Sequence, residues 1–379
     1  MSSTSQVTAR VAVIGAGIAG ATCAASLSEA GLAVTLFDKA RGTGGRMATR
    51  RAEWPAADGS LVRAEFDHGA QHIQARHPRF KAAMRRAAAA GIVAAWAPRV
   101  HAAWPAPVQR ESWVPLPQMP ALARHLIGET PVHLGFQVQR LQRSGDGWRV
   151  VSVDGSTEGP FDQVLLAMPP AQAAVLLAGH HDRWADGLAA LRMEPCWTLM
   201  AVTQDLDWPW DACEPDIRRS PLAWVARNDR KPGRSAPSGM ATWVAHASAA
   251  WSAAQLEASP AAVQAALSQA LAALLPMGTK LQWHHRAVQR WRYAVPAQPS
   301  ATSVADSECW WDARRGLGVC GDFLGGAAAS AGGVEAAWRS GDELADTLLA
   351  ALDHETAAAR PLDEQPRVQG QERFLAHAA

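Results

Sequence analysis

The thirty residues that follow Ala9 constrain the fold most strongly, because a glycine pattern lies between two apolar runs. Residues 11–14 (VAVI) are typical of a buried parallel strand, and GAGIAG follows them at GxGxxG spacing. The pattern predicts a helix over residues 18–29 and a second strand over residues 33–37 that ends in Asp38. This unit therefore predicts a dinucleotide-binding βαβ fold, with a βαβ unit that binds no nucleotide as the alternative.

Each glycine of this unit has its own expected task. Gly15 permits the tight turn, Gly17 lets the backbone approach a pyrophosphate, and Gly20 lets the helix pack closely on the strand. The helix N-terminus offers N–H groups to phosphate, and Asp38 is placed to accept from ribose hydroxyls. The candidate nucleotide-binding residues here are Gly15, Ala16, Gly17, Ile18, Ala19, Gly20, Asp38 and Lys39.

The next segment favours FAD over NAD. Residues 41–46 read RGTGGR, in which the glycines let the backbone lie against a large ligand and the arginines can neutralise phosphate. An exposed glycine-rich loop is the alternative. We expect Arg41, Gly45, Arg46 and Met47 to contact the cofactor.

A segment almost three hundred residues later predicts the other end of the site. Residues 317–320 (LGVC) indicate a buried strand, and Gly321 and Asp322 follow at its carboxyl end, where ligands bind in open α/β sheets. Asp322 is either an acceptor for ribityl hydroxyls or a turn aspartate. A helix from Val334 to about residue 352 would stabilise the reduced flavin through its N-terminus, which makes Gly333 and Val334 further candidates.

The order of these motifs, with FDHGAQ at 66–71, AMPP at 167–170 and QRWRY at 289–293, resembles bacterial renalase-like flavoproteins of the amine-oxidase-like FAD superfamily. The resemblance covers about residues 9–352. It implies an α/β fold: an FAD/NAD(P)-binding Rossmann-like three-layer domain with an α+β second domain that carries an antiparallel substrate sheet. It also implies non-covalent FAD, with a covalent link to Cys309 or Cys320 as the alternative. The implied enzyme is an oxidase that passes hydride from a 2- or 6-dihydronicotinamide dinucleotide to flavin N5, with dioxygen reoxidising the flavin to give hydrogen peroxide.

The same resemblance suggests the reaction centre. The segment with His68, Gly69, Ala70 and Gln71 would run beneath the flavin, and Val138 would also contact the cofactor. His246 would lie over the flavin, Trp291 would stack in the pocket, and Arg292 would hold a carboxamide or stabilise reduced flavin. The candidate catalytic residues are His72, His246, Trp291 and Arg292. Surface or cap roles for His68 and His72, a sheet role for His246 and a core role for Trp291 remain open.

Three other functions are considered. Many amine oxidases use an aromatic pair and a lysine near the flavin, for which this chain offers Tyr293, its single tyrosine, and Lys280. A non-catalytic or redox-sensing flavoprotein would keep FAD as a structural group. A monooxygenase would need NADPH, and the sequence has no second GxGxxG unit for it.

Composition limits the partners and the location. The 379 residues suggest about two domains, and a net charge of +1 gives no reason to expect nucleic acid. No apolar run approaches the roughly 20 residues of a membrane span, and residues 1–8 lack a signal-peptide pattern. The five cysteines form no CxxC pair, which favours reduced thiols and no metal site. We expect a cytoplasmic enzyme that acts on a small molecule and O2.

The periodicity also predicts how the chain is divided. The FAD domain would comprise residues 1–75, 131–170 and 284–352, and the substrate domain residues 76–130 and 171–283. A C-terminal tail would follow over 353–379, with residues 357–379 expected to be poorly ordered. Strands at 138–141, 148–153 and 161–167 predict a meander, and strands at 198–202, 222–225 and 241–246 predict the antiparallel sheet. Helices are expected at 77–90, 120–127 and 259–275, and residues 227–239 are expected to form a long mobile loop.

Overall fold

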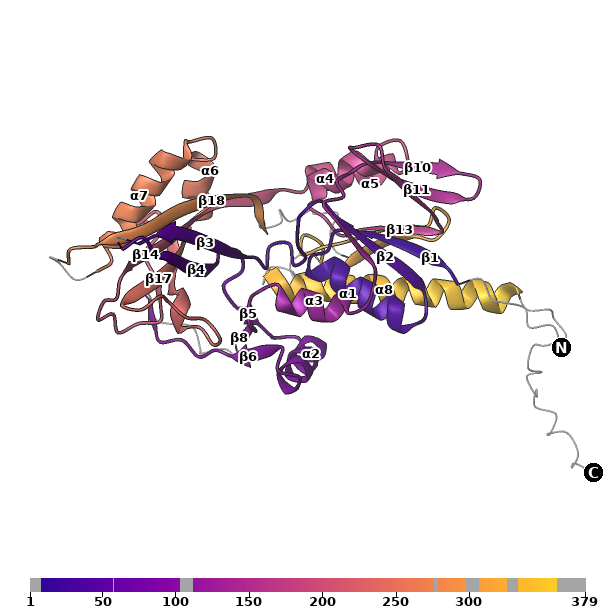
Figure 1. Cartoon of the computed structure of the whole chain (residues 1–379). Coiled ribbons are helices and arrows are strands. Elements are labelled where there is room, and N and C mark those ends of the chain that lie inside the picture. The colour runs from indigo at the N-terminus through magenta and orange to yellow at the C-terminus, as the bar shows by residue number, and fades with distance from the viewer. Residues whose placement is uncertain are drawn as a thin grey trace, which may run out of the picture.

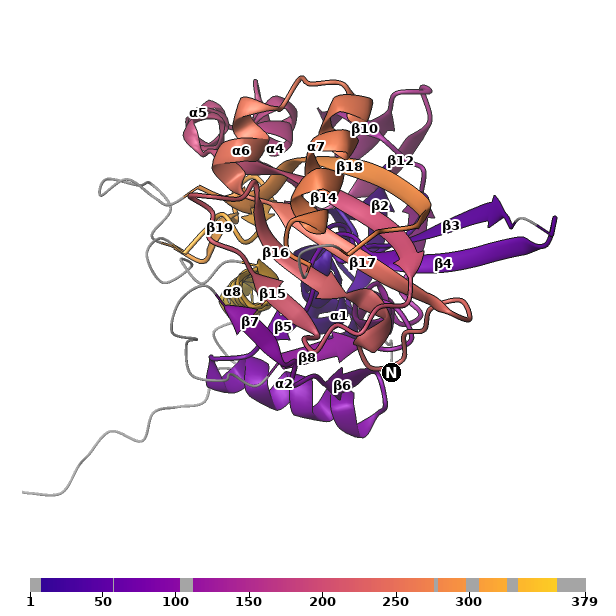
Figure 2. The same cartoon turned by 90° about the vertical axis from the view of Figure 1, so that its left-hand side faces the viewer.

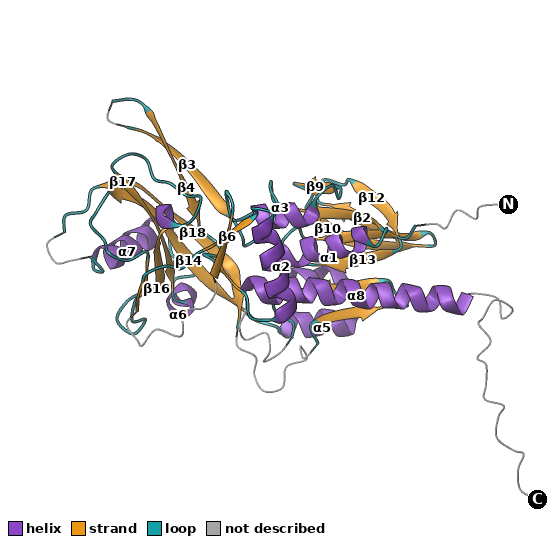
Figure 3. Ribbon diagram, turned by 90° about the horizontal axis from the view of Figure 1, so that it is seen from below, coloured by secondary structure: helices purple, strands orange, loops and turns teal. Residues whose placement is uncertain are grey.

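A computed structural model describes residues 8–56, 58–102, 112–275, 279–297, 307–325 and 333–359. The chain forms two lobes, each built on a six-stranded sheet (Figure 1). The long helix α8 (Gly333–Ala359) runs along one side of the first lobe, roughly parallel to α1 (Ile18–Glu29), as Figure 3 shows from below.

The first sheet is parallel except at one edge. Its strand order is β19-β20-β13-β1-β2-β9, and only β19 runs antiparallel to its neighbour. Along the central strand, Val11 and Val13 face one core while Ala12 and Ile14 face another, so both faces of the sheet are covered. The bounds of the strands are β1 (Arg10–Ile14), β2 (Ala33–Asp38), β9 (Val132–Leu134), β13 (Gln163–Leu166), β19 (Cys309–Asp312) and β20 (Leu317–Cys320).

Helices cover one face of this sheet and a meander covers the other (Figure 1). The helical layer holds α1, α3 (Ala121–Ile127) and α8. The other layer holds β10 (Val138–Ser144), β11 (Gly147–Ser152), β12 (Thr157–Phe161), α4 (Pro170–Leu177) and α5 (Asp182–Ala190). Helices α1 and α8 approach closely because Gly341 has no side chain: a Cβ there would lie 2.1 Å from the carbonyl oxygen of Ala19. The three-layer Rossmann-like domain expected from the sequence is therefore confirmed.

The second sheet has the strand order β18-β14-β17-β16-β15-β7, with antiparallel pairs except between β15 and β7. Helices α6 (Ala249–Ala254) and α7 (Pro260–Ala272) cover one face (Figure 2). The hairpin of β3 (Thr49–Pro55) and β4 (Leu61–Asp67) packs on the other face, where Phe66 meets Met200 and Val244. The strands are β7 (Val100–Ala102), β14 (Met193–Gln204), β15 (Ala212–Glu214), β16 (Leu222–Arg227), β17 (Met240–Ala247) and β18 (Trp283–Pro296).

A small third sheet joins the two lobes. It has the order β5-β8-β6 and lies beside α2 (Pro78–Ala89). Its strands are β5 (Ile73–Gln74), β6 (Val93–Ala95) and β8 (Ser112–Pro115). The ring of Phe80 on α2 packs against that of Trp338 on α8, with the centroids 5.4 Å apart and the planes tilted by 48°. Helix α2 therefore belongs to the helical core of the first lobe.

Three expectations about elements need correction. The third meander strand is β12, not residues 161–167, because Gln163–Leu166 already belongs to the first sheet. Helix α8 continues to Ala359, beyond the expected end at residue 352, while residues 360–379 of the predicted tail lie outside the described residues. Helix α3 and helix α4 both pack on the first lobe, although the proposed division assigns them to the substrate domain.

The predicted mobile loop at 227–239 is anchored instead. It opens with a 3-10 turn, η1 (Asn228–Arg230), and Asn228 is only 1% exposed. The guanidinium of Arg227 pairs with Asp205 and Asp229, at 2.9 and 2.8 Å. The polar residues that suggest a solvated loop in the sequence bond to one another and to β4.

Two global features complete the description of the fold. None of the helices in the described ranges has both the length and the apolar character needed to cross a membrane. None of the five cysteines forms a disulfide, and Cys320 is fully buried on β20, where it packs in the core of the first lobe.

Candidate functional site

The carboxyl ends of β1, β2, β13 and β20 meet at one edge of the first sheet. The turn at Gly15 follows β1 and Asp38 ends β2. The carboxylate of Asp38 accepts the N–H of Ala16 at 2.7 Å and that of Ala40 at 2.8 Å. The predicted acid and the glycine turn therefore form one connected unit.

The glycines of this turn separate into two kinds. A Cβ on Gly15 or Gly20 would collide with backbone, at 2.2 and 1.9 Å, so these two glycines are needed for packing. A Cβ on Gly17 would meet nothing within 4 Å, and its φ of −78° suits any residue. Helix α1 has no side-chain cap and no acidic residue in its first turn, so neither its cap nor its first turn supplies an anion to its N-terminal N–H groups. Both observations fit a bound diphosphate.

The RGTGGR loop lies against this turn and reaches the far strand. The N–H of Gly44 donates to the carbonyl of Ala16 at 2.8 Å. The Arg46 guanidinium binds both carboxylate oxygens of Asp322, at 2.7 and 2.6 Å, and the carbonyl of Ala294 at 2.9 Å. Asp322 is 1% exposed. The sequence predicted that Arg46 would bind phosphate and that Asp322 would accept from ribityl hydroxyls. In the structure the two side chains form an ion pair with each other.

The other predicted cofactor residues surround the same edge. Ile18, Ala19 and Met47 are buried, Lys39 donates to the side chain of Gln172 at 3.1 Å, and Arg41 is exposed. Val138 begins β10, just after Phe136, whose N–H donates to the carbonyl of Asp38 at 2.9 Å. The N–H of Gly321 donates to the Ser340 hydroxyl at 2.8 Å. Gly333 and Val334 begin α8, but residues 326–332 that precede them lie outside the described residues.

The DHGAQ segment connects this edge to the second sheet. A Cβ on Gly69 would clash with the carbonyl of Arg46, and the N–H of Ala70 donates to the same carbonyl at 2.9 Å. Trp291 donates from Nε1 to the carbonyl of His68 at 3.0 Å, and their rings lie 5.1 Å apart.

A second contact links the same segment to β17. Gln71 Nε2 lies 3.2 Å from His246 Nε2. The structure therefore brings together four predicted residues from three places in the chain: His68, Gln71, His246 and Trp291.

A buried lysine that the sequence did not reveal lies at the centre of this group. Lys231 Nζ contacts Gln71 Oε1 at 3.1 Å and Asp67 Oδ2 at 3.4 Å. Burial lowers the pKa of Lys231 to about 8, against the opposing charge of Asp67. No motif marks this lysine, because it stands in a polar stretch beside proline and glycine. Lys280, the lysine considered from the sequence, is exposed just before β18.

Asp67 is saturated by its own partners. Its carboxylate accepts from Thr49 at 2.7 Å and pairs with Arg234 at 3.0 Å as well as with Lys231. Asp67 and Lys231 have fully buried side chains, and that of Arg234 is 2% exposed. Two buried cations therefore face one buried carboxylate beside Gln71 and His246.

Arg292 is not part of this group, contrary to the sequence prediction. Its guanidinium binds both carboxylate oxygens of Glu257, at 2.8 and 3.1 Å, on an exposed surface. Consecutive residues of a strand point to opposite faces, so Arg292 turns away where Trp291 turns inward. The predicted contact of Arg292 with substrate or flavin is wrong.

His72 lies in an aromatic setting next to the same group. Its ring is 5.7 Å from that of Trp96 and 5.4 Å from that of Trp224, which pairs with His246 in the register of β16 and β17. Within the described part of the chain, His68 Nδ1, His72 Nδ1 and Trp224 Nε1 are buried without a hydrogen-bond partner. Buried polar atoms are almost always paired, so this cluster is suited to a polar ligand.

The histidines make the stability of the protein sensitive to acid. Burial, reinforced by the charge of Lys231, lowers the pKa of both His72 and His246 from 6.5 to about 4. Between pH 6.5 and 4 the unfolded chain binds protons that the folded chain does not, so stability falls as pH falls. We expect a loss of roughly 2 kcal/mol for each ring between pH 7 and 5.

Urea denaturation at pH 7 and pH 5 tests this expectation. The variant His246→Gln should lose less stability over that interval than the parent protein, and the exposed control His125→Gln should lose as much. Equal acid sensitivity in the parent and in His246→Gln would contradict the assigned neutral state of His246.

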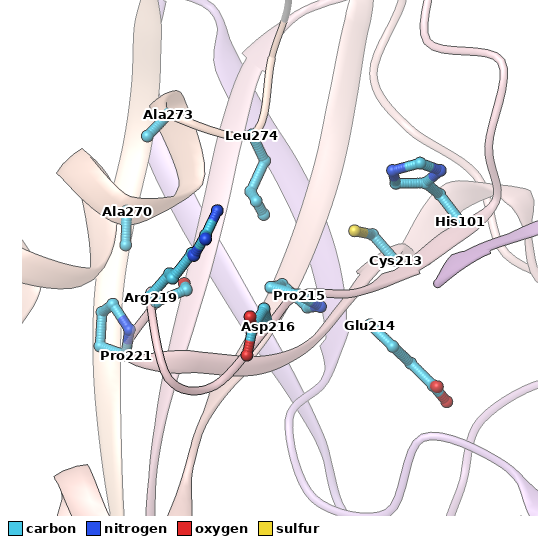
Figure 4. Close-up of a pocket in the computed structure, with 11 residues that line it drawn as sticks. His101, Cys213, Glu214, Pro215, Asp216, Arg219, Pro221, Ala270, Ala273 and Leu274 are labelled. Atoms are coloured by element: carbon cyan, nitrogen blue, oxygen red, sulfur yellow. The ribbon is translucent and has the colours of Figure 1, made fainter. Parts of the chain in front are cut away.

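A separate hollow of about 300 Å³ lies in the second lobe, between α7 and the loop that joins β15 and β16 (Figure 4). Its walls include His101, Cys213, Asp216, Arg219 and Leu274. It shares no residue with the groups described above, and we assign it no part in the chemistry.

The comparisons with known proteins agree with this geometry. The chain matches the family described as flavin containing amine oxidoreductase over residues 108–349, and the NAD(P)-binding Rossmann-like domain over residues 13–87. The fold and the site define an FAD-dependent oxidoreductase. Since the first match spans more than half of its length, the chain belongs to the flavin-containing amine oxidoreductase family.

Solved structures share the fold at low sequence identity. Cyclohexylamine oxidase from Brevibacterium oxydans superposes with a TM-score of 0.65 at 14% identity, covering 92% of this chain and 100% of that chain. A candidate protoporphyrinogen oxidase from Exiguobacterium sp. 255-15 gives 0.67 at 13% identity, covering 93% and 100%.

A curated relative is more similar in sequence but much longer. It is the tRNA 5-methylaminomethyl-2-thiouridine biosynthesis bifunctional protein of Magnetococcus marinus, which is 29% identical over 201 residues. That match covers 43% of this chain and only 30% of the relative, so the chain spans less than a third of the relative's length.

Proposed function

We propose that this protein is a renalase-like oxidase whose substrate is a 2- or 6-dihydro isomer of NADH or NADPH. Bound FAD would supply the redox chemistry, in which the dihydronicotinamide is oxidised by loss of hydride and O2 is reduced to hydrogen peroxide. The chain's own residues bind and orient the substrate and set the charge around it.

The charge at the centre of the site is the observation that carries this proposal. Lys231 and Arg234 face one carboxylate, Asp67, which is already saturated by them and by Thr49. Among the described residues, Asp67 is the only acid that acts on the pKa of Lys231. An ammonium substrate would be repelled by the net positive charge there, whereas the neutral ring of a dihydronicotinamide would not be.

The unpaired polar atoms support the same substrate class. An indole N–H can only donate, so Trp224 Nε1 requires an acceptor such as a carboxamide oxygen. The neutral ring of His72, 5.4 Å from that of Trp224, presents an unpaired Nδ1. The rings of Trp96 and Trp224 offer flat apolar walls for a planar ring.

An amine oxidase is the second candidate, because the family and the fold relatives include amine oxidases. Many amine oxidases use a lysine near the flavin, and Lys231 is a buried lysine in this site. From the sequence, Lys280 was the candidate for that role. The family membership leaves no support for the non-catalytic alternative. A cytoplasmic location and non-covalent FAD belong to the proposal. The five cysteines form no disulfide, as is usual for proteins of a reducing compartment.

The decisive experiment is anaerobic mixing of the purified yellow protein with a panel of donors. The panel contains NADH, NADPH, their 2- and 6-dihydro isomers, and several primary amines including cyclohexylamine. Flavin bleaching at each donor is followed by stopped-flow absorbance. Rapid bleaching by the 2- or 6-dihydro isomers is expected, and bleaching by amines alone would overturn the proposal in favour of the second candidate.

A further inference from the structure

Three polar groups of the site form a chain of hydrogen bonds whose direction can be deduced. Lys231 Nζ lies 3.1 Å from Gln71 Oε1, and Gln71 Nε2 lies 3.2 Å from His246 Nε2. An ammonium can only donate, so the amide oxygen of Gln71 accepts from Lys231. The amide nitrogen must then donate to His246, whose Nε2 is therefore unprotonated and whose proton is on Nδ1.

The surroundings of Gln71 give independent support for this direction. Its Nε2 is also in contact with the main-chain carbonyl oxygens of Asp67 and Gly69, the second at 3.2 Å. If the amide were reversed, its oxygen would face the two carbonyl oxygens. Its nitrogen would then face the ammonium of Lys231, so that two donors would meet. The amide orientation is therefore fixed from three sides.

His246 is held neutral by the same environment. Burial is the main cause that lowers its pKa to about 4, and the charge of Lys231 adds to it. The main-chain carbonyl of His68 opposes this shift, which places an acceptor beside the imidazole ring. The same carbonyl accepts from Trp291, so the chain of hydrogen bonds ends where β4 and β18 meet.

We propose that Lys231 is the residue that determines substrate specificity at this site. Its ammonium orients Gln71 and, through it, fixes His246 as the neutral Nδ1–H tautomer, and its charge excludes cationic amines in favour of substrates that bear a hydrogen-bond acceptor. This inference rests on the proposed function and deepens it, because it assigns the choice between dihydronicotinamides and amines to one side chain. Lys231 acts through other residues, so its role is that of a positioning residue.

Lys231 is the group in this cluster whose protonation changes closest to neutral pH. Asp67 on β4 attracts the ammonium and Arg234 repels it, while the neighbouring imidazoles are neutral above pH 5 or so, given a pKa of about 4 for His72 and His246. Burial brings the pKa of Lys231 to about 8. The exclusion of cations is therefore present below pH 8 and is lost as pH rises through that value. The titratable and charged groups that act on Lys231 or are acted on by it are Asp67, His72, Arg234 and His246.

The test uses Lys231→Met, which keeps the approximate volume and removes the charge, with the exposed lysine variant Lys280→Met as the matched control. Binding of benzyltrimethylammonium, whose charge does not titrate, is followed by perturbation of the flavin spectrum. In Lys231→Met this cation should bind at least tenfold more tightly, and flavin reduction by 6-dihydro-NAD should slow about tenfold or more and lose its pH dependence between pH 7 and 9.5. Lys280→Met should match the parent protein in all three measurements.

A second variant separates orientation from charge and serves if Lys231→Met does not fold. Gln71→Met removes the hydrogen bonds that connect Lys231 with His246 but keeps the ion pair of Lys231 with Asp67. It should slow flavin reduction by 6-dihydro-NAD while still excluding the quaternary cation. An unchanged reduction rate in folded Gln71→Met, or unchanged cation binding and pH profile in folded Lys231→Met, would overturn the role of Lys231.

The failure of this inference can be distinguished from the failure of the proposed function. If the parent protein is bleached by no dihydronicotinamide, the proposed function is wrong, whatever Lys231 does. If the parent protein is bleached by 6-dihydro-NAD but the Lys231 and Gln71 variants behave as the parent does, only the inference about Lys231 is wrong.

Discussion

Replacing Arg46 with methionine is expected to cost about 3–5 kcal/mol of folding free energy and to yield colourless protein. Asp322 is 1% exposed, and both of its carboxylate oxygens are bound by Arg46, so the variant leaves a buried carboxylate without a partner. The pair also ties the RGTGGR loop to the end of β20, across 276 residues of sequence. Urea denaturation and the ratio of FAD to protein measure the two losses.

The asymmetry of this ion pair sharpens the test. Arg46 has a side chain that is 35% exposed, so Asp322→Leu leaves a cation that water can still reach and should cost less than Arg46→Met. The double variant should be more stable than Arg46→Met alone, because removing both charges leaves no buried group unpaired. It should still bind FAD poorly, since Arg46 and Asp322 both lie at the edge where the cofactor is expected.

A surface ion pair provides the control for these variants. Arg63 and Glu53 pair at 2.8 Å on the β3–β4 hairpin with side chains that are 73% and 52% exposed. Arg63→Met should change stability by no more than about 1 kcal/mol. If Arg46→Met costs no more than Arg63→Met, the assignment of Arg46 and Asp322 as the pair that holds the cofactor edge together is wrong.

The fold of the first lobe could be predicted because its signals are local. The apolar run of β1, the glycines after it and Asp38 at the end of β2 all lie within thirty residues, and each has a physical reason that applies in any such unit. The carboxyl ends of parallel strands meet at one edge, so the rule also placed Asp322 near the glycine turn, although they are distant in sequence.

The substrate side could be predicted only in part, because its contacts are tertiary. Lys231 stands in a stretch whose proline, glycine and charged residues are typical of a solvated loop, and only its burial against β4 reveals it. The error at Arg292 was avoidable in principle. Trp291 and Arg292 are consecutive residues of β18, so they cannot both point to the same face.

Alanine substitutions at Gly20 and Gly17, three residues apart, should have opposite consequences for folding and the same consequence for colour. Together they test whether the glycine turn is built for a ligand. Gly20→Ala places a Cβ 1.9 Å from the carbonyl oxygen of Gly15, so α1 cannot pack on β1 and the variant should fail to fold. Gly17→Ala places its Cβ in open space on an extended backbone with a φ of −78°, so its denaturation curve should match that of the parent protein.

The loss in Gly17→Ala should appear only in cofactor binding. If the pyrophosphate of FAD approaches the backbone here, the added methyl group occupies its place, and FAD affinity should fall about 100-fold or more, equivalent to roughly 3 kcal/mol. Reconstitution of the apoprotein with FAD, followed by flavin fluorescence quenching, measures this affinity. Gly145→Ala, in the turn between β10 and β11, is the matched control because its Cβ also meets nothing within 4 Å, and it should change neither property strongly. A folded Gly17→Ala protein that binds FAD as the parent does would mean that the cofactor does not lie against this turn, because no contact within the described residues requires a glycine at that position.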